Sequence, residues 1–281
     1  MTGESSQAVR IAAIGDLHIR TQSPEHLEAD LIALEGQVDL LVITGDITES
    51  GRIPEVEVAA RLLAPVRVPM VGVLGNHDRR GLRRTAMRRM LEDSGLVLLD
   101  GDSRDFAFRD GLTVGVAGVS GTGGGFWLDE ADAEVGSRLR QAVSVKARRE
   151  SIRLKKALDT LRRRGPDVAI AVMHFSPTTT TLGEEPVLKH WMLGNSYLGR
   201  IIDEEDVDLV LHGHAHLGNR DGETSGGTPV RNVALQVTGG ISVFEVAPGK
   251  QVRSIGDSPE PPECRHSETS RIRMLDMIRN D

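Results

Sequence analysis

The feature that most constrains the fold is an alternation of short apolar runs and helical segments in the first half of the chain. Residues 10–15, 40–44 and 69–74 are rich in Ile and Val and have the length of strands. The segments between them, residues 24–37 and 54–63, each begin with a proline, which suits the first turn of a helix. This alternation predicts parallel strands joined by helices, and strands that are apolar throughout predict a sheet covered on both faces.

The rest of the 281 residues continues the pattern. We expect helices at residues 82–93, 130–164 and 196–205, and strands at 97–99, 105–109, 112–119, 168–174, 207–212, 229–237 and 241–246. One domain is therefore expected over residues 1–248. Residues 257–263 contain three prolines, so we expect residues 249–281 to form a linker and a short terminal helix near 271–278.

Composition excludes several classes of function. The net charge of −7 gives no overall field that would attract a polyanion, which argues against a nucleic-acid partner. Cys264 is the only cysteine, so a disulfide within the chain and a thiolate metal cluster are excluded. The apolar runs are shorter than the roughly 20 residues of a membrane span. No secretory signal precedes Ile11, so we expect a cytoplasmic protein without a membrane partner.

Polar residues follow five of the expected strands, at the point where each strand ends. These motifs are Asp16-Leu17-His18, Gly45-Asp46, Gly75-Asn76-His77-Asp78, His174, and Gly213-His214-Ala215-His216. Open α/β sheets place their functional sites at such strand ends. Taken singly, each motif also fits a bland role, because Asp and Asn cap turns and a lone His can be a core residue.

Taken together, the five motifs form a ligand set of nitrogen and oxygen atoms without sulfur. This chemistry suits Mn, Fe, Zn or Co and is poorly suited to Ca. The set is larger than one tetrahedral site needs, so two ions that share a carboxylate are the simplest interpretation.

The order and content of these motifs resemble the calcineurin-like metallophosphoesterases over residues 16–216. The resemblance implies an α/β fold, a four-layer αββα sandwich with two mixed sheets flanked by helices. It also implies two divalent metal ions, with Mn, Fe or Zn expected. By this resemblance the first ion is bound by Asp16, His18 and His216, the second by Asn76, His174 and His214, and both by the bridging Asp46. His77 corresponds to the general acid of the family.

The resemblance implies a phosphoester hydrolase in which a hydroxide between the two ions attacks phosphorus directly. Two divalent ions, two carboxylates and one hydroxide leave a net positive charge, which favours an anionic phosphate. His77 has to protonate the departing oxygen, and this requires a nearby anion to hold the imidazolium. Glu49 is the candidate for that anion, and a solvated loop carboxylate is the alternative.

The sequence leaves the substrate open. A small phosphorylated molecule is expected, either a phosphomonoester or a phosphodiester, and a DNA nuclease or a catalytically silent binding scaffold of the same fold are the alternatives. Arginines crowd residues 79–89, where they form either a basic rim that attracts phosphate-rich substrates or a solvated helix face. The segments 176–186 and 190–196 are the candidates for the wall of the substrate pocket.

Overall fold

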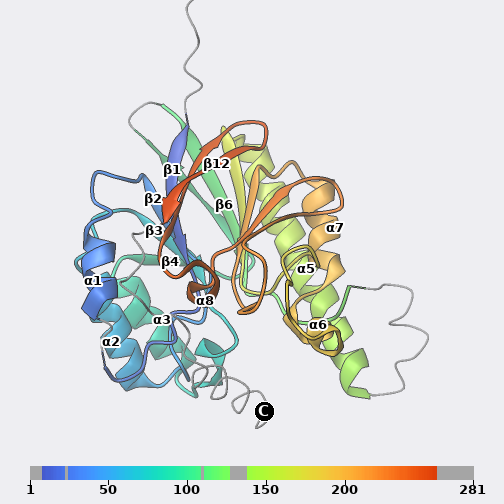
Figure 1. Cartoon of the computed structure of the whole chain (residues 1–281), viewed down its shortest axis with the longest axis horizontal. Helices are drawn as coiled ribbons and strands as arrows, with labels where there is room; N and C mark the ends of the chain where they lie inside the picture. The colour runs from blue at the N-terminus through green and yellow to red at the C-terminus, as the bar shows by residue number, and fades with distance from the viewer. Residues whose placement is uncertain (1–7, 23–24, 109–110, 127–137, 258–281) are drawn as a thin grey trace, which may run out of the picture.

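The computed structural model describes residues 8–22, 25–108, 111–126 and 138–257. Two six-stranded sheets lie face to face, with helices on the outer side of each sheet (Figure 1). Both sheets mix parallel and antiparallel neighbours, which confirms the expected sandwich of four layers.

The first sheet has the strand order β12-β11-β1-β2-β3-β4. Its strands are β1 (Val9–Ile14), β2 (Leu40–Ile43), β3 (Met70–Val73), β4 (Leu96–Leu99), β11 (Ser242–Ala247) and β12 (Gln251–Asp257). The first four strands run parallel, as the alternation with helices predicts. Strand β11 pairs antiparallel with β1, and β12 closes the edge as its hairpin partner.

The second sheet has the strand order β5-β6-β7-β8-β10-β9. Its strands are β5 (Asp102–Ala107), β6 (Thr113–Val119), β7 (Val168–Met173), β8 (Leu209–His212), β9 (Asp221–Glu223) and β10 (Pro229–Asn232). The four central strands are parallel, and the two edge strands are antiparallel to their neighbours.

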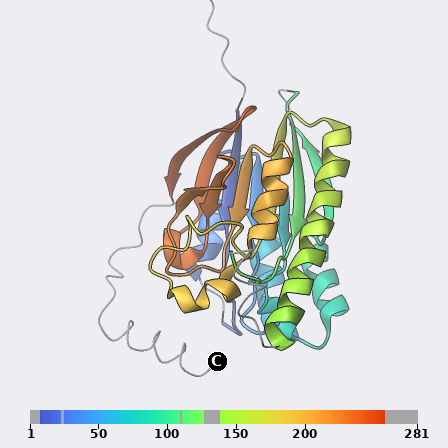
Figure 2. The same cartoon turned by 90° about the vertical axis from the view of Figure 1, so that its right-hand side faces the viewer.

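Three apolar layers hold the four structural layers together. Helices α1 (Glu25–Ile32), α2 (Ile53–Leu63) and α3 (Arg84–Asp93) cover the first sheet, and α5 (Arg138–Arg164) and α7 (Ser196–Glu204) cover the second (Figures 1 and 2). In β1 the side chains alternate: Ala12 and Ile14 pack toward the helices, whereas Ile11 and Ala13 pack between the sheets. Both faces of the strand are therefore buried, as its apolar sequence predicts.

One predicted strand is wrong in its extent. We expected a strand over residues 229–237, but β10 ends at Asn232 and a short helix, α8 (Leu235–Thr238), follows. The chain crosses between the sheets here: Val233 donates its N–H to His212 of the second sheet, and Gly15 of the first sheet donates to the carbonyl of Val233. Val233 packs between the sheets and Leu235 packs on the helix side of the first sheet, and the apolar pattern of these residues does not distinguish this crossing from a continuous strand.

The boundary expected at residue 248 needs a correction, because β12 extends the first sheet to Asp257. The linker and helix expected over the remaining residues lie outside the described part of the chain, as do residues 130–137 of the helix expected to begin at residue 130. Short helical turns at η1 (Asp78–Arg80), η2 (Val187–Lys189) and α6 (His190–Leu193) complete the described elements. No helix among the described residues is long and apolar enough to cross a membrane.

Candidate metal centre

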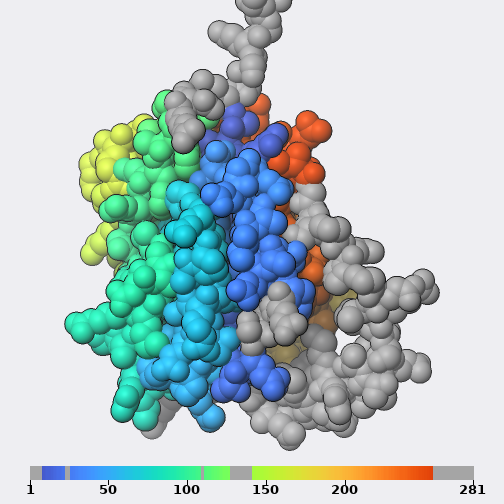
Figure 3. Space-filling view, turned by 90° about the vertical axis from the view of Figure 1, so that its left-hand side faces the viewer, coloured from blue at the N-terminus to red at the C-terminus, as the bar shows by residue number. Residues whose placement is uncertain are grey.

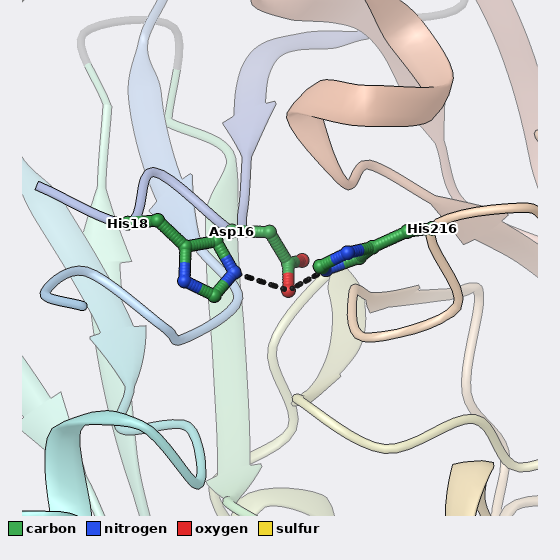
Figure 4. Close-up of side chains that lie close together, drawn as sticks. All are labelled: Asp16, His18 and His216. Atoms are coloured by element: carbon green, nitrogen blue, oxygen red, sulfur yellow. Dashed lines mark hydrogen bonds and ion pairs between the residues drawn. The ribbon is translucent and has the colours of Figure 1, made fainter. Parts of the chain in front are cut away.

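The ends of the parallel strands bring the five motifs together at one edge of the sandwich. Asp16 follows β1, and its Oδ1 atom lies 2.9 Å from Nε2 of His216, which follows β8. Nε2 of His18 lies 3.9 Å from the same oxygen. Figure 4 shows the rings of His18 and His216 on either side of the Asp16 carboxylate. The three expected ligands of the first ion therefore surround one point.

A second group forms around Asp46, which follows β2. Nε2 of His174 lies 3.2 Å from Oδ2 of Asp46 and 2.9 Å from Oδ1 of Asn76. Asp46, His174 and His214 each offer a donor atom, and these atoms lie within 4.8 Å of one another. Oδ2 of Asp46 is also 3.9 Å from Nε2 of His18. Asp46 therefore stands between the two groups, in the position expected of a shared carboxylate.

The backbone is unusual at these residues. Four of the expected ligands have a φ in the left-handed region: Asp16 (56°), His18 (44°), Asp46 (47°) and His214 (70°). Lys250 is the only other non-glycine residue in the described part of the chain with a positive φ. Such conformations cost free energy and concentrate at functional sites, so the strain singles out the same residues as the motifs do.

Glycines in two of the motifs allow the loops to approach each other. A Cβ atom on Gly75 would lie 2.0 Å from Oδ1 of Asp46, and a Cβ atom on Gly213 would lie 2.1 Å from Oδ2 of Asp16. Either contact is far shorter than van der Waals distance. These positions require glycine because the neighbouring carboxylates occupy the space of a side chain.

The donor atoms fit divalent cations. Nε2 of His18 is buried and has no hydrogen-bond partner among the described residues, although it lies at an equal distance from the Asp16 and Asp46 carboxylates. A buried polar atom without a partner is rare in proteins unless a ligand or water satisfies it. Nδ1 of His174 donates to the carbonyl of Thr44 at 3.0 Å, which directs Nε2 toward Asp46, as outer hydrogen bonds do for histidine ligands.

Burial and charge shift the protonation of these groups. Burial alone would lower the pKa of His174, but the Asp46 and Asp16 carboxylates outweigh it and raise the pKa to about 9. Burial, together with the positive charge on His174, lowers the pKa of His214 to about 3, so this imidazole is neutral at neutral pH. The histidine charge also holds the pKa of Asp46 below its usual range, against the opposing effect of burial. The carboxylates of Asp16 and Asp46 are therefore both ionised, and a cation placed between them would be stabilised.

His77 lies beside this centre but is held differently from the sequence expectation. Its Nδ1 atom lies 2.7 Å from the backbone carbonyl oxygen of Glu49, whereas the Glu49 carboxylate is 3.8 Å away. The same carboxylate is 3.6 Å from Nδ1 of His18. The carbonyl can only accept, so Nδ1 of His77 carries a hydrogen and Nε2, which is 4.0 Å from Oδ2 of Asp46, faces the centre. The backbone of Glu49 orients His77, and its side chain adds a nearby negative charge.

Asp78 is a residue of the site to which the sequence analysis gave no role. Its fully buried carboxylate accepts hydrogen bonds from the backbone N–H groups of Ile47, Thr48 and Gly75 and from the Thr48 hydroxyl. It therefore ties the loop of Asp46 to the loop of Asn76. Burial raises the pKa of Asp78, and the charge of Asp46 raises it further. The only signal in the sequence was its place directly after His77.

Both segments expected to wall the substrate pocket line a cavity, but not one that includes the expected metal ligands, so their role in the substrate pocket stays a prediction. A cavity of about 600 Å³ lies between them and α7, with Pro177, Thr178, Val187, His190 and Ser196 among its lining residues. None of the expected metal ligands lines it. The second segment approaches the centre at another point, where Nε2 of His214 lies 3.3 Å from the carbonyl oxygen of Met192.

The chain is similar to known phosphoesterases in sequence pattern and in fold. The family model of the calcineurin-like phosphoesterases matches residues 9–218, whereas none of the curated proteins matches the chain. A calcineurin-like phosphoesterase of Bacillus subtilis has a TM-score of 0.52 and 13% identity, with 98% of each chain covered. A putative 5'-nucleotidase of Staphylococcus aureus has a TM-score of 0.55 and 15% identity, over 96% of this chain and 58% of its own.

The same fold also includes a protein described as an anchor in the inner membrane complex of Plasmodium. It has a TM-score of 0.53 and 13% identity, over 96% of this chain and 94% of its own. At such identities these likenesses establish the fold, and the function has to be argued from the site.

Proposed function

Because the chain belongs to the calcineurin-like phosphoesterase family, we propose that it is a metal-dependent hydrolase of a small phosphomonoester or phosphodiester. The observation that carries the proposal is the position of the Asp46 carboxylate. Its Oδ2 atom lies 3.2 Å from Nε2 of His174 and 3.9 Å from Nε2 of His18, so it faces both groups of donor atoms. One carboxylate between two ligand groups is the arrangement that a pair of ions requires.

In this proposal Asp16, His18 and His216 bind one divalent ion, Asn76, His174 and His214 bind the other, and Asp46 binds both. The absence of sulfur from the ligand set favours Mn, Fe or Zn. When bound, such ions would activate a water molecule for attack on phosphorus and neutralise the phosphoryl oxygens. No protein side chain is then needed as the nucleophile.

His77 is the proton donor in the proposal. The Glu49 carbonyl holds the hydrogen on Nδ1, so the imidazolium can release a proton only from Nε2, which faces Asp46 and the centre. The carboxylates of Asp46 and Glu49 both lie within 4.0 Å of the ring nitrogens of His77 and place negative charge beside the ring. A leaving oxygen that accepts this proton departs as a neutral alcohol, which is the contribution of a general acid.

The test is a panel of chromogenic substrates with protein reconstituted separately with Mn²⁺, Fe²⁺ and Zn²⁺. We expect hydrolysis of 4-nitrophenyl phosphate or bis(4-nitrophenyl) phosphate that is lost on chelation. For a phosphoester whose leaving group is a weakly acidic alkyl alcohol, His77→Gln should lower kcat by about 10²- to 10⁴-fold, the range of general acid catalysis, while the metal content stays the same.

His26→Gln is the matched control, because His26 is exposed on α1, away from the ligand set. A metal-loaded protein that hydrolyses no phosphoester would contradict the proposal and favour a binding scaffold. Full activity of His77→Gln toward the alkyl ester would leave a phosphoesterase but remove His77 from its mechanism.

A further inference from the structure

Arginines gather on the side of the centre where His77 lies. We use the term arginine rim for five exposed arginines: Arg20, Arg52, Arg80, Arg83 and Arg84. The chain as a whole has a net charge of −7, so this concentration of positive charge opposes the average of the molecule. The segment that carries η1 and α3 lies on the face of the first helix layer, which faces the viewer in Figure 3.

Contacts within the fold connect this rim to the proposed general acid. Nη2 of Arg20 lies 3.5 Å from Oε2 of Glu49, and Oε1 of Glu49 lies 3.8 Å from Nδ1 of His77. Arg80 ends the short helical turn that begins one residue after His77. A Cβ atom on Gly81 would lie 2.0 Å from the carbonyl oxygen of Gly51, so the loop of Arg80 and Arg83 packs directly against the loop of Arg52.

Most guanidinium groups of the arginine rim form no ion pair with the described residues. Arg79 and Arg88 pair with Asp100 and Glu92, but no carboxylate of the described residues lies within 4.0 Å of the guanidinium groups of Arg52, Arg80, Arg83 or Arg84. Arg20 is exposed by 68% of its side chain and contacts Glu49 through one nitrogen. A guanidinium carries five N–H donors, so most of the donors of Arg20 remain open to a ligand.

The opposite flank of the centre has a different character. There the ring of His214 lies 4.2 Å from the ring of Phe175, and its Nε2 atom faces the carbonyl oxygen of Met192. This flank offers an aromatic face and a hydrogen-bond acceptor, neither of which favours an anion. The two sides of the centre therefore differ in the charge that they attract.

We propose that the arginine rim binds a second anionic group on the leaving group of the substrate. The inference rests on the proposed function, because His77 defines where the leaving oxygen departs. That oxygen meets Nε2 of His77, and the guanidinium groups that flank His77 are those of Arg20, linked to the Nδ1 side of the ring through Glu49, and of Arg80, three residues along the chain. The preferred substrate is a phosphoester whose leaving group carries further negative charge, such as another phosphate, which arginine recognises by paired N–H donors.

The first test compares two chromogenic diesters, methyl 4-nitrophenyl phosphate and its analogue with a carboxylate at position 3 of the ring. The readout is the ratio of kcat/KM for the charged and the uncharged leaving group, because the intrinsic reactivity of each ester cancels when wild type and variant are compared. Arg20→Ala should lower this ratio about two- to fivefold, as expected for an exposed ion pair, and Arg80→Ala/Arg83→Ala should lower it by a similar factor. Arg149→Ala is the control, because Arg149 is exposed on α5, the helix that covers the other sheet.

The second test measures binding without turnover. Inositol hexasulfate is titrated into the metal-free protein in a calorimeter, at low salt and again at 0.5 M NaCl. We expect binding that weakens in the rim variants, persists in Arg149→Ala and is lost at high salt, where exposed charges are screened. Equal binding by wild type and rim variants would overturn the inference.

The outcomes separate the two proposals. Hydrolysis of both esters with the same ratio in wild type and rim variants overturns the rim but leaves the phosphoesterase. If metal-loaded protein hydrolyses neither ester, the proposed function is overturned, and so is the proposal that the arginine rim binds the leaving group. Rim-dependent binding of single-stranded DNA, combined with an unchanged ester ratio, would make the rim a nucleic-acid surface and contradict the inference.

Discussion

Asp78 offers a sharp test of how the centre is held together, since one side chain joins two of its loops. Oδ1 of Asp78 accepts from the backbone N–H and the hydroxyl of Thr48, at 2.8 and 2.7 Å. Oδ2 accepts from the N–H groups of Gly75 and Ile47, at 3.0 and 3.2 Å. Asp78→Asn keeps the shape of this side chain but replaces one acceptor oxygen by an NH₂ donor.

The hydrogen bonds of Asp78 set how much stability Asp78→Asn should lose. The amide fits best with its oxygen toward Gly75 and Ile47, because the Thr48 hydroxyl can rotate and accept from the new NH₂ group. One buried backbone N–H, that of Thr48, is then left without a partner, which costs about 1–3 kcal/mol. Asp78→Ala removes the acceptors of three N–H groups and should cost more. Because the loops of Asp46 and Asn76 lose their common anchor, metal affinity should also fall by about 10- to 100-fold.

The assay combines urea unfolding of the metal-free protein with a Mn²⁺ titration. Asp208→Asn is the matched control: Asp208 is also buried and accepts from the N–H groups of Ala169, Gly249 and Lys250, but it lies away from the centre. Both variants should lose stability, and only Asp78→Asn should lose metal affinity. Equal metal affinities in the two variants would refute the role of Asp78 as an anchor of the centre.

Three further predictions concern the same site. Metal-free protein should lose stability as pH rises from 6.5 through about 9, because the raised pKa of His174 stabilises the folded state only while the imidazole is protonated; denaturation curves across this range test it, and an equal loss in His174→Gln would contradict it. Gly75→Ala should weaken Mn²⁺ binding in the same titration, because its Cβ would displace Asp46, and unchanged affinity would show that the loops yield freely. Glu49→Gln should lower kcat less than tenfold, since the Glu49 backbone carbonyl holds His77, and a loss as large as that of His77→Gln would assign the orientation to the carboxylate instead.

The convergence of the five motifs could be predicted because it follows from simple geometry. Parallel strands share the edge at which their carboxyl ends lie, so polar residues that follow β1, β2 and β3 are brought side by side in one sheet. The apolar character of β7 and β8 likewise predicts a buried second sheet, whose strand ends supply His174 and the last motif. That the two sheets would face each other with these edges aligned came from the family resemblance.

Other features depend on interactions that a linear pattern does not carry. Strand β9 is short and polar, with two of its three residues exposed, so it lacks the apolar signature of a strand. Strand β12 lies at an edge, where it forms by pairing with β11. The role of the Glu49 carbonyl was hidden because every residue has a carbonyl, and only the folded loop shows which one His77 meets.

The most direct test of the account is the metal stoichiometry of the protein. Metal-free protein is dialysed against Mn²⁺, and the bound metal per chain is determined by elemental analysis, with electron paramagnetic resonance to detect magnetic coupling between neighbouring ions. We predict two Mn²⁺ ions per chain with a coupled signal that disappears in Asp46→Ala, since Asp46 is the carboxylate that faces both ligand groups. Absence of stoichiometric Mn²⁺, or a coupled pair that persists without Asp46, would contradict the account.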